Sequence, residues 1–392
     1  MLTSTSCEVA AQEVLDRCLA GHPPETLPRA LIEEPCGKAL FGILVEGLAD
    51  RFEPALCDIY ARLFAPVVRG SVARYQRVRR PRPVLGEPKR VLVLSRVTLG
   101  ADVAVTSVLL AAAKVRFPKA EIFFVGPTKN YELFAADSRL GHLPVSYQRG
   151  SLWDRLAVQE DLKALAAAPG CLVIDPDSRL TQLGLLWVGE DDRYHLFESR
   201  GYGGESDRAL PELAADWAAE TFGVRGAKPY VAIPRDAARY ITINLGVGEN
   251  LAKRIPDPFE EQLIALLAAT GEPVIIDKGA GGEEAARVER AVERAGVNVR
   301  FWEGSFAGFA RLIAASRLYV GYDSAGQHVA AALGVPLISI FAGFPAPRMF
   351  DRWKPIGPRS TVIRVERPDP AETLDRVGQT IAFRGLSCHD PR

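Results

Sequence analysis

The feature that most constrains this chain is an alternation, repeated twice, of short apolar runs with longer stretches of helical periodicity. Residues 90–95, 121–126 and 171–175 are apolar on both faces of an extended strand, and helical patterns separate them. The alternation restarts at 240–245 and continues through 273–277 and 337–341. Strands of this kind joined by helices predict parallel sheets that are covered on both sides. The predicted fold class is therefore α/β.

Length and periodicity divide the chain into three parts. With 392 residues it is too long for one ordinary domain. Residues 1–88 show helical spacing of apolar side chains and end in a basic linker, residues 89–228 hold the first set of strands, and residues 229–392 hold the second set and a final helix at 369–383. We expect two α/β domains preceded by a helical region.

A run of arginines and prolines at 74–83 lies between the helical region and the first strand. Charged residues mixed with proline are typical of a connector, so we expect these arginines to be solvated. Contact with the anionic surface of a membrane is a second reading of the same segment.

Composition argues against some partners and compartments. Lys plus Arg and Asp plus Glu number 48 each, and the lack of a basic excess argues against a nucleic-acid partner. Six cysteines without a Cys-x-x-Cys spacing favour reduced, mostly buried thiols over a disulfide framework or a zinc site. The first residues lack the pattern of a signal peptide, and no apolar run is long enough to span a bilayer. We therefore expect a cytoplasmic protein.

The junction of a predicted strand and a predicted helix near residue 323 carries the clearest chemistry. Asp323 and Ser324 end the strand, and the small residues Ala325 and Gly326 let an anion approach the backbone. His328 follows in the first helical turn. Ligands of open parallel sheets bind beyond the carboxyl ends of the strands, and a helix N-terminus favours phosphate. The sequence thus predicts a phosphate site, with a plain helix cap and a packed core histidine as the alternatives.

This junction is similar to the signature of the family 9 glycosyltransferases, the bacterial heptosyltransferases of lipopolysaccharide synthesis. The signature has an acid, a hydroxyl residue, two small or turn residues, a histidine, an alanine-rich helix and a Gly-x-Pro strand, here residues 323–336. The family usually has Gly-Pro where this chain has Ala325 and Gly326. Residues 352–357, Arg-Trp-Lys-Pro-Ile-Gly, resemble its Trp-x-Pro-x-Gly segment. The resemblance covers residue 90 to the C-terminus and implies GT-B, two facing Rossmann-like domains, with the helical region as an addition.

The resemblance also implies a donor site on the second domain. The segment from Gly246 to Lys253 looks like the family's loop after the first strand of that domain, where the lysine meets the donor diphosphate. An acid that holds the nucleoside follows the next strand, and Glu283 or Glu284 matches it. Without the resemblance, Lys253 reads as a surface lysine and either glutamate as a helix-start carboxylate.

On the first domain the resemblance implies a catalytic base and an acceptor site. The segment around Arg96 and Gly100 is similar to the family's Arg…Leu-Gly-Asp-Val, in which the aspartate deprotonates the acceptor hydroxyl. Asp102 is the matching residue, although Ala101 is inserted before it. The alternatives are that Asp102 caps a helix and that Arg96, assigned to an anionic acceptor or phosphate, forms a surface ion pair.

The implied activity is inverting, metal-independent transfer of a sugar, a heptose by resemblance, from a nucleotide-diphosphate donor such as ADP-heptose to a glycan, lipid-linked glycan or other hydroxyl acceptor. No cofactor is expected. The segment from Asp175 to Asp177 is read as a strand end and a turn, not as a metal motif. A non-catalytic nucleotide-binding or assembly protein, and a sugar-nucleotide epimerase or hydrolase, are the alternatives. Peripheral contact with the cytoplasmic face of the inner membrane fits such an acceptor, and the sequence does not indicate an oligomeric state.

Overall fold

The computed structural model describes residues 4–33, 35–248, 250–279 and 281–385. The chain forms two compact units. Unit 1 contains Met1–Tyr131, Asp137–Pro229 and Pro345–Arg352, and unit 2 contains Glu132–Ala136, Tyr230–Phe344 and Trp353–Arg392. Among the described residues, every helix is too short or too polar to cross a bilayer.

Unit 1 begins with a group of helices and continues as an α/β unit. The first helices are α1 Ser4–Leu19, α2 Arg29–Ile32, α3 Gly37–Ala39, a π-helical segment Leu40–Val45, α4 Glu46–Ala49, α5 Pro54–Phe64 and α6 Val72–Val78. The strands are β1 Arg90–Leu94, β2 Glu121–Gly126, β3 Leu140–Pro144, β4 Cys171–Asp175 and β5 Tyr194–Leu196. The helices between and after them are α7 Leu99–Ala101, a π-helical turn Asp102–Thr106, α8 Ser107–Arg116, α9 Thr128–Tyr131, α10 Leu152–Leu156, α11 Val158–Ala166 and α12 Leu210–Phe222.

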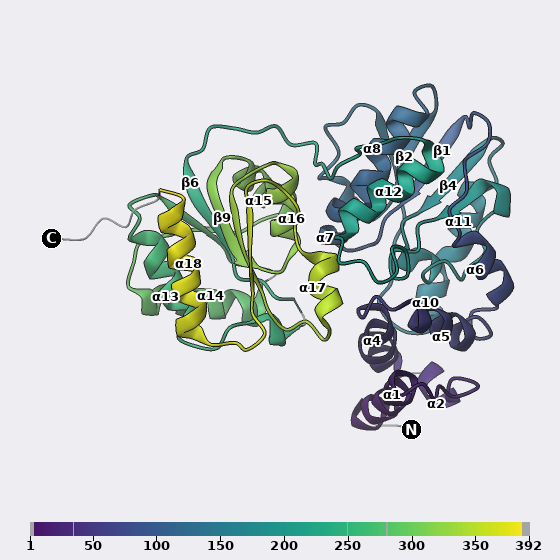
Figure 1. Ribbon diagram of the computed structural model, residues 1–392, viewed down its shortest axis with the longest axis horizontal. Coiled ribbons are helices and arrows are strands. Elements are labelled where there is room, and N and C mark those ends of the chain that lie inside the picture. The colour runs from purple at the N-terminus through teal and green to yellow at the C-terminus, as the bar shows by residue number, and fades with distance from the viewer. Residues whose placement is uncertain (1–3, 34, 249, 280, 386–392) are drawn as a thin grey trace. The chain divides into compact units, whose positions relative to one another are not determined.

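The sheet of unit 1 is fully parallel, in the order β3-β2-β1-β4-β5. Alternate residues of β1 face opposite sides, because side chains alternate along a strand. Leu92 and Leu94 join one core that also contains side chains of α1, α5 and α6. On the other side, α8 packs against β1, β2 and α12. The first helices and the sheet therefore share one core (Figure 1).

The segment 74–83, expected to be a solvated linker, is partly helical and partly buried in the structure. Its first part is α6, and Arg74 is only 8% exposed. The Arg74 Nε donates to Asp191 Oδ1 at 2.7 Å, and the Arg82 Nη2 donates to the Tyr194 carbonyl at 2.7 Å. Arg74 and Arg82 are therefore packing residues of unit 1, because their partners lie more than 100 residues further along the sequence. Arg77 and Arg80 are exposed, as expected of a linker.

The expectation that every cysteine is a free thiol was wrong for two of them. Cys7 of α1 and Cys36, just before α3, form a disulfide with a Cα–Cα distance of 5.2 Å. The sequence separation of 29 residues gave no local signal of this pairing. Cys18, Cys57 and Cys171 are free and buried, as expected. Cys388 lies outside the described residues.

Unit 2 holds a second parallel sheet. Its strands are β6 Tyr240–Asn244, β7 Val274–Asp277, β8 Arg300–Trp302, β9 Ser316–Tyr322, β10 Leu337–Phe341 and β11 Ser360–Arg364. Its helices are α13 Phe259–Ala268, α14 Gly282–Ala295, α15 Phe306–Ala314, α16 Ala325–Ala332 and α18 Pro370–Phe383, and α17 is Pro347–Trp353. The order β11-β10-β9-β6-β7-β8 is that of a Rossmann sheet.

Helices cover both faces of this second sheet. Figure 1 shows α13, α14 and α18 on one face and α15 and α16 on the other. Residues of α13, α14 and α18, including Leu263, Val288 and Val377, form one core with β6 and β9. The predicted class of two parallel-sheet α/β units is confirmed.

Candidate active site

In unit 2 the strand order reverses between β6 and β9, and the polar residues predicted from the sequence gather there. The two strands are parallel neighbours, with Asn244 paired to Gly321 in register. Loops that follow them leave in opposite directions along the sheet and open a crevice at its carboxyl edge. Gly246 follows β6, and Asp323 and Ser324 follow β9. The fold therefore brings these predicted residues to one edge.

Asn244, the last residue of β6, connects three strand ends. Its Oδ1 accepts hydrogen bonds from the Ser324 hydroxyl at 3.1 Å and from the Gly246 backbone N–H at 3.1 Å. Its Nδ2 donates to Asp277 Oδ2, at the end of β7, at 2.7 Å. This amide fixes the loops after β6, β7 and β9 relative to one another.

Lys253 and Asp323 form an ion pair across the crevice loops. The Lys253 ammonium lies 2.6 Å from Asp323 Oδ2 and 3.3 Å from the Asp323 carbonyl oxygen. Gln327 donates to the other carboxylate oxygen, and the Gln327 Oε1 in turn accepts from Ser339. Lys253 is therefore not a free surface lysine. It is partly buried and held at the start of α16.

Ser324 and Gly326 shape the start of α16. Ser324 is its N-cap residue, but among the described residues no side chain caps the helix by a hydrogen bond. The Ser324 hydroxyl instead contacts Asn244 and, at 3.4 Å, the Tyr319 hydroxyl. A Cβ on Gly326 would lie 2.3 Å from the Tyr319 hydroxyl, so only glycine fits there. The Ser324 side chain therefore does not act as the plain helix cap considered as the alternative, and the phosphate site stays a prediction.

His328 lies inside unit 2. It is 6% exposed, and its ring packs edge-on to Trp353 with centroids 6.0 Å apart. Burial lowers the pKa of His328 to about 4, with Asp323 opposing this and Lys253 adding to it. His328 therefore lies where the packed core histidine was expected, and its ring is neutral at pH 7.

The two candidate glutamates begin α14 and differ in position. Glu283 is exposed, whereas Glu284 is half-buried. A Cβ added to Gly246 would lie 2.6 Å from Glu284 Oε1, so this carboxylate sits directly over the loop after β6. Both glutamates line a cavity of about 320 Å³ together with Val247 and Leu251 of the same loop. Glu284 is the better placed of the two for contact with a nucleoside near Gly246.

In unit 1 the corresponding edge is organised by Asp102, which is completely buried. Its Oδ1 accepts from the Arg96 backbone N–H at 2.7 Å and from the Thr106 hydroxyl at 2.6 Å. Its Oδ2 accepts from Ser95 at 2.6 Å and from Asn130 at 2.5 Å. Burial raises the pKa of Asp102, and these hydrogen bonds act in the opposite direction. In this conformation the carboxylate holds the loops together and does not reach solvent.

The inserted residue Ala101 is accommodated by the helix itself. Residues Asp102–Thr106 form a π-helical turn between α7 and α8. A π turn takes up one extra residue without shifting the helix that follows, and such turns are frequent at functional sites. Val97, just before it, has φ of 60°, which is strained for a β-branched residue. The loop is therefore held in an unusual conformation by the contacts around Asp102.

Arg96 and Gly100 flank this carboxylate. The Arg96 guanidinium is half-buried and donates to the Pro176 carbonyl and, at 2.8 Å, to the Ser199 hydroxyl. Burial lowers the pKa of Arg96. Gly100 lies within α7 and is half-exposed. Arg96 thus connects the end of β1 to the segments that follow β4 and β5.

The segment Asp175 to Asp177 is a strand end and a turn, as predicted. Asp175 ends β4 and accepts from the Ser178 backbone N–H at 2.7 Å. Asp177 has φ of 67° and pairs with Arg200 at 3.0 Å. Among the described residues, no group of three or more His, Cys, Asp and Glu side chains is arranged to hold a metal ion.

Sequence reasoning missed three polar residues of these sites, Asn244, Gln327 and Asn130. Asn130 is buried and holds Asp102 from α9, the short helix after β2. Asn244 carried a signal that went unused, since an amide that ends an apolar strand just before glycine lies at the carboxyl edge of the sheet. Gln327 and Asn130 lie within or beside helices, where nothing local distinguishes them.

Comparisons with known proteins agree with this geometry. The model of the family described as glycosyltransferase family 9 (heptosyltransferase) matches residues 196–378. Among solved structures, E. coli heptosyltransferase WaaC with ADP is 21% identical, with a TM-score of 0.57 over 75% of this chain and 99% of that one. E. coli ADP-heptose LPS heptosyltransferase II is 18% identical, with a TM-score of 0.54 over 76% and 99%. A family 9 glycosyl transferase from Veillonella parvula is 15% identical, with a TM-score of 0.56 over 76% and 90%.

No curated protein matches the chain. The solved structures show the fold, two parallel-sheet units of the GT-B type, and the family match lies on the region that contains the Lys253–Asp323 pair and the start of α16. The resemblance predicted from the sequence is confirmed over residues 196–378, which match the model described as glycosyltransferase family 9 (heptosyltransferase).

Proposed function

We propose that this protein transfers a heptose from ADP-heptose to a hydroxyl group of a glycan or lipid-linked glycan, with inversion at the anomeric carbon. The observation that carries the proposal is the Lys253–Asp323 pair, 2.6 Å apart, beside the uncapped first turn of α16 at the reversal of strand order. The donor is taken from the solved structures with this fold, one of which contains ADP and another an ADP-heptose analogue. Unit 2 is the donor half.

The donor diphosphate binds where positive charge is already arranged. The Lys253 ammonium and the backbone N–H groups at Ala325 and Gly326 face the developing charge on the leaving group. Ser324 adds a hydroxyl donor, and Glu284 accepts from the hydroxyl groups of the ribose. Because these groups belong to the chain itself, we propose that the transfer does not require a metal ion.

The acceptor half is unit 1. The acceptor oxygen attacks the anomeric carbon while its proton passes to Asp102, and the bond between that carbon and the diphosphate breaks, leaving ADP. Asp102 meets this hydroxyl only if one of its four hydrogen bonds opens, because a base must lie within about 3 Å of the proton it takes. Ser95 is the donor best able to turn away, since its hydroxyl rotates about a single bond.

Calorimetric titration with ADP tests the donor site. We expect Lys253→Ala to weaken ADP binding roughly 10- to 100-fold, as expected for loss of a charge-assisted hydrogen bond. Arg317→Ala is the matched control, because Arg317 pairs with Glu272 at the opposite end of β9. Equal affinity in the two variants would show that the diphosphate does not bind at Lys253.

Transfer itself is tested with ADP-heptose and a panel of soluble and lipid-linked glycans, with ADP release and product mass as readouts. A heptosylated product formed equally well in EDTA supports the proposal in full. Release of free heptose without an acceptor would instead indicate a hydrolase. Tight ADP binding without any turnover would indicate a nucleotide-binding protein, a reading that the burial of Asp102 favours over the hydrolase.

A further inference from the structure

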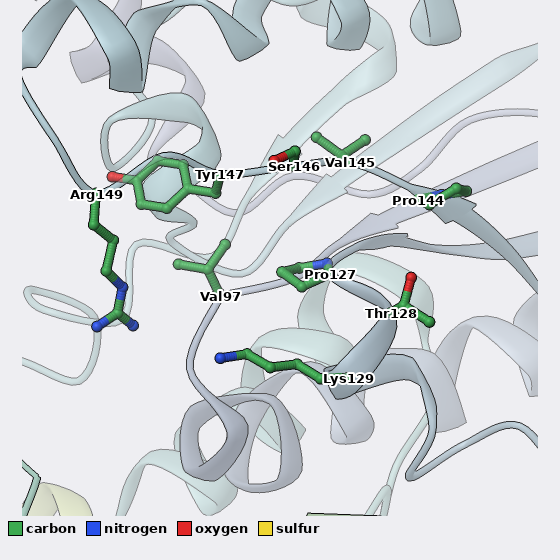
Figure 2. A pocket seen from close by; sticks show the side chains of 9 residues that line it. All are labelled: Val97, Pro127, Thr128, Lys129, Pro144, Val145, Ser146, Tyr147 and Arg149. Atoms are coloured by element: carbon green, nitrogen blue, oxygen red, sulfur yellow. The ribbon is translucent and has the colours of Figure 1, made fainter. Parts of the chain in front are cut away.

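A cavity of about 460 Å³ lies at the carboxyl edge of the sheet in unit 1, and none of the residues assigned above lines it. Its walls come from the end of β3, from α9 and from the loops after β1, β2 and β3 (Figure 2): Val97, Pro127, Thr128, Lys129, Pro144, Val145, Ser146, Tyr147 and Arg149. Two of these residues adjoin the contacts of Asp102 in sequence, since Val97 follows Arg96 and Lys129 precedes Asn130. The cavity is thus beside the predicted base.

Two cations face this cavity without a partner. Lys129 and Arg149 are exposed, and within the described ranges neither side chain has an ion pair or a hydrogen bond. Figure 2 shows the Lys129 ammonium pointing to the side of the cavity where the Arg149 guanidinium lies. Most arginines of this unit are paired with a carboxylate or a carbonyl, for example Arg74, Arg79 and Arg155. Unpaired cations at a concave surface favour an anionic ligand.

The wall that carries Arg149 is held by the helical region. Arg155 of α10 is 9% exposed and donates to the Tyr147 hydroxyl at 3.0 Å and to the Arg149 carbonyl at 2.9 Å. Its guanidinium lies over the ring of Phe41, 3.6 Å from the centroid. Phe41 belongs to the π-helical segment Leu40–Val45 and is itself buried. The contact from Phe41 through Arg155 therefore sets the position of Tyr147 and Arg149.

The helical region also approaches this loop through its backbone. A Cβ added to Gly37 of α3 would lie 3.0 Å from the Gly150 carbonyl oxygen. A capping box of Ser151 and Asp154 then fixes the start of α10 directly after the loop. The loop between β3 and α10 is thus clamped on one side by the helical region and on the other by its own helix start.

From these contacts we infer that the cavity binds the acceptor through a phosphate or carboxylate group, and that the helical region shapes it through Phe41 and Arg155. Lys129 and Arg149 contact the anionic group, while Val97, Pro127 and Tyr147 contact the sugar ring. Arg155 is a positioning residue, because it touches the wall and not the ligand. This inference rests on the proposed transferase function and adds the chemical class of its acceptor.

Binding of three sugars tests the class of ligand. Glucose 6-phosphate, glucuronate and glucose carry a phosphate, a carboxylate and no charge, and ligand-observed NMR titration measures each affinity. We expect the phosphate or the carboxylate sugar to bind at least tenfold more tightly than glucose. We expect the double variant Lys129→Met with Arg149→Met to lose that difference in affinity. The control is Lys119→Met, which changes an exposed lysine elsewhere in unit 1 and is expected to keep the difference. Equal binding of glucose, or no effect of the double variant, would overturn the inference.

A matched pair of variants tests the helical region. Phe41→Leu removes the ring under Arg155, whereas Phe64→Leu removes a buried ring of α5 that stacks on Tyr60. Both lose packing, so their stabilities fall together, but only Phe41→Leu is expected to weaken binding of the charged sugar, by about tenfold. Equal binding by the two variants would show that the helical region does not shape the cavity.

An ADP titration on the same samples separates the two proposals. Retained ADP binding with no preference for charged sugars refutes this inference alone. If the unmodified protein does not bind ADP, the proposed donor site is refuted instead.

Discussion

Replacing Thr106 by valine tests whether Asp102 is the centre of the carboxyl edge of the sheet in unit 1. Valine has almost the same shape as threonine, so the change removes a hydroxyl and leaves the packing in place. Thr106 is fully buried, and its hydroxyl donates to Asp102 Oδ1 at 2.6 Å. After the change, that oxygen keeps only the Arg96 backbone donor.

The loss expected from this single contact is large. A hydrogen bond to a charged acceptor contributes about 1.5–3 kcal/mol, and a fully buried carboxylate has no water to replace the missing donor. For a unit of this size each kcal/mol shifts the melting temperature by about 2–4 °C. We therefore expect Thr106→Val to lower the melting temperature of unit 1 by roughly 3–12 °C.

Thr98→Val is the matched control, since Thr98 lies in the same loop, is exposed, and makes no side-chain cap to α7 among the described residues. Surface changes of this kind alter stability by about half a kcal/mol or less. Differential scanning calorimetry of both variants, with and without ADP, distinguishes the units, because a ligand of unit 2 raises the transition of that unit. Equal melting temperatures for the two variants would refute the view of Asp102 as a buried, saturated carboxylate.

The same variant also separates a structural role from a catalytic one. Removing a donor to the ionised form raises the pKa of a carboxyl group. If Asp102 is the base, the acidic limb of the pH dependence of kcat/KM moves to higher pH in Thr106→Val. If Asp102 only holds the loops together, the profile keeps its shape while the amount of folded protein falls.

Two further predictions concern acid and redox conditions. Burial lowers the pKa of His195 and His328 to about 4, below the ordinary value, so their contribution to stability is complete above about pH 6.5 and is lost as the pH falls toward about 4. We expect the melting temperature to fall over that window and to fall less in His328→Gln; parallel curves for the two proteins would contradict this. The Cys7–Cys36 disulfide closes a loop of 29 residues, so its reduction is expected to lower the free energy of unfolding by about 3–4 kcal/mol. We expect a lower melting temperature in dithiothreitol, and we expect Cys7→Ser to show the same decrease without reductant. An unchanged melting temperature in dithiothreitol would contradict it.

The central strands were predictable because burial dictates their residues directly. Strands β1, β2 and β4 are apolar on both faces, and the sequence placed them to within a residue. The edge strands β5 and β11 were missed, since three residues of β5 and the mixed pattern of β11 carry too little periodicity. Helix α12 was missed as well, although its Pro211 and its Gly223 are ordinary start and stop signals.

The carboxyl edge of the sheet in unit 2 was easier to predict than that of the sheet in unit 1. Asp323 and Ser324 are close to one another and to α16 in sequence, so a local motif describes most of that site. Asp102 depends on donors from three other places, Ser95, Thr106 and Asn130, which only the folded sheet brings together. Its role as a base stays a prediction, because burial of the carboxylate is a property of those long-range contacts and leaves no trace in the local sequence.

The helical region is a structural part of unit 1. Its side chains share a core with β1 and β4, and the Tyr75 hydroxyl donates to buried Glu198 at 2.5 Å. Glu198 also pairs with Arg79 of the former linker at 3.0 Å, and the neighbouring Ser199 contacts Arg96 at the carboxyl edge of the sheet. Removing the region would leave the Glu198 carboxylate buried without these partners, at a cost of several kcal/mol. A chain without its first helices is therefore expected to lose the fold of unit 1, and with it the acceptor edge, instead of becoming a smaller version of the same enzyme.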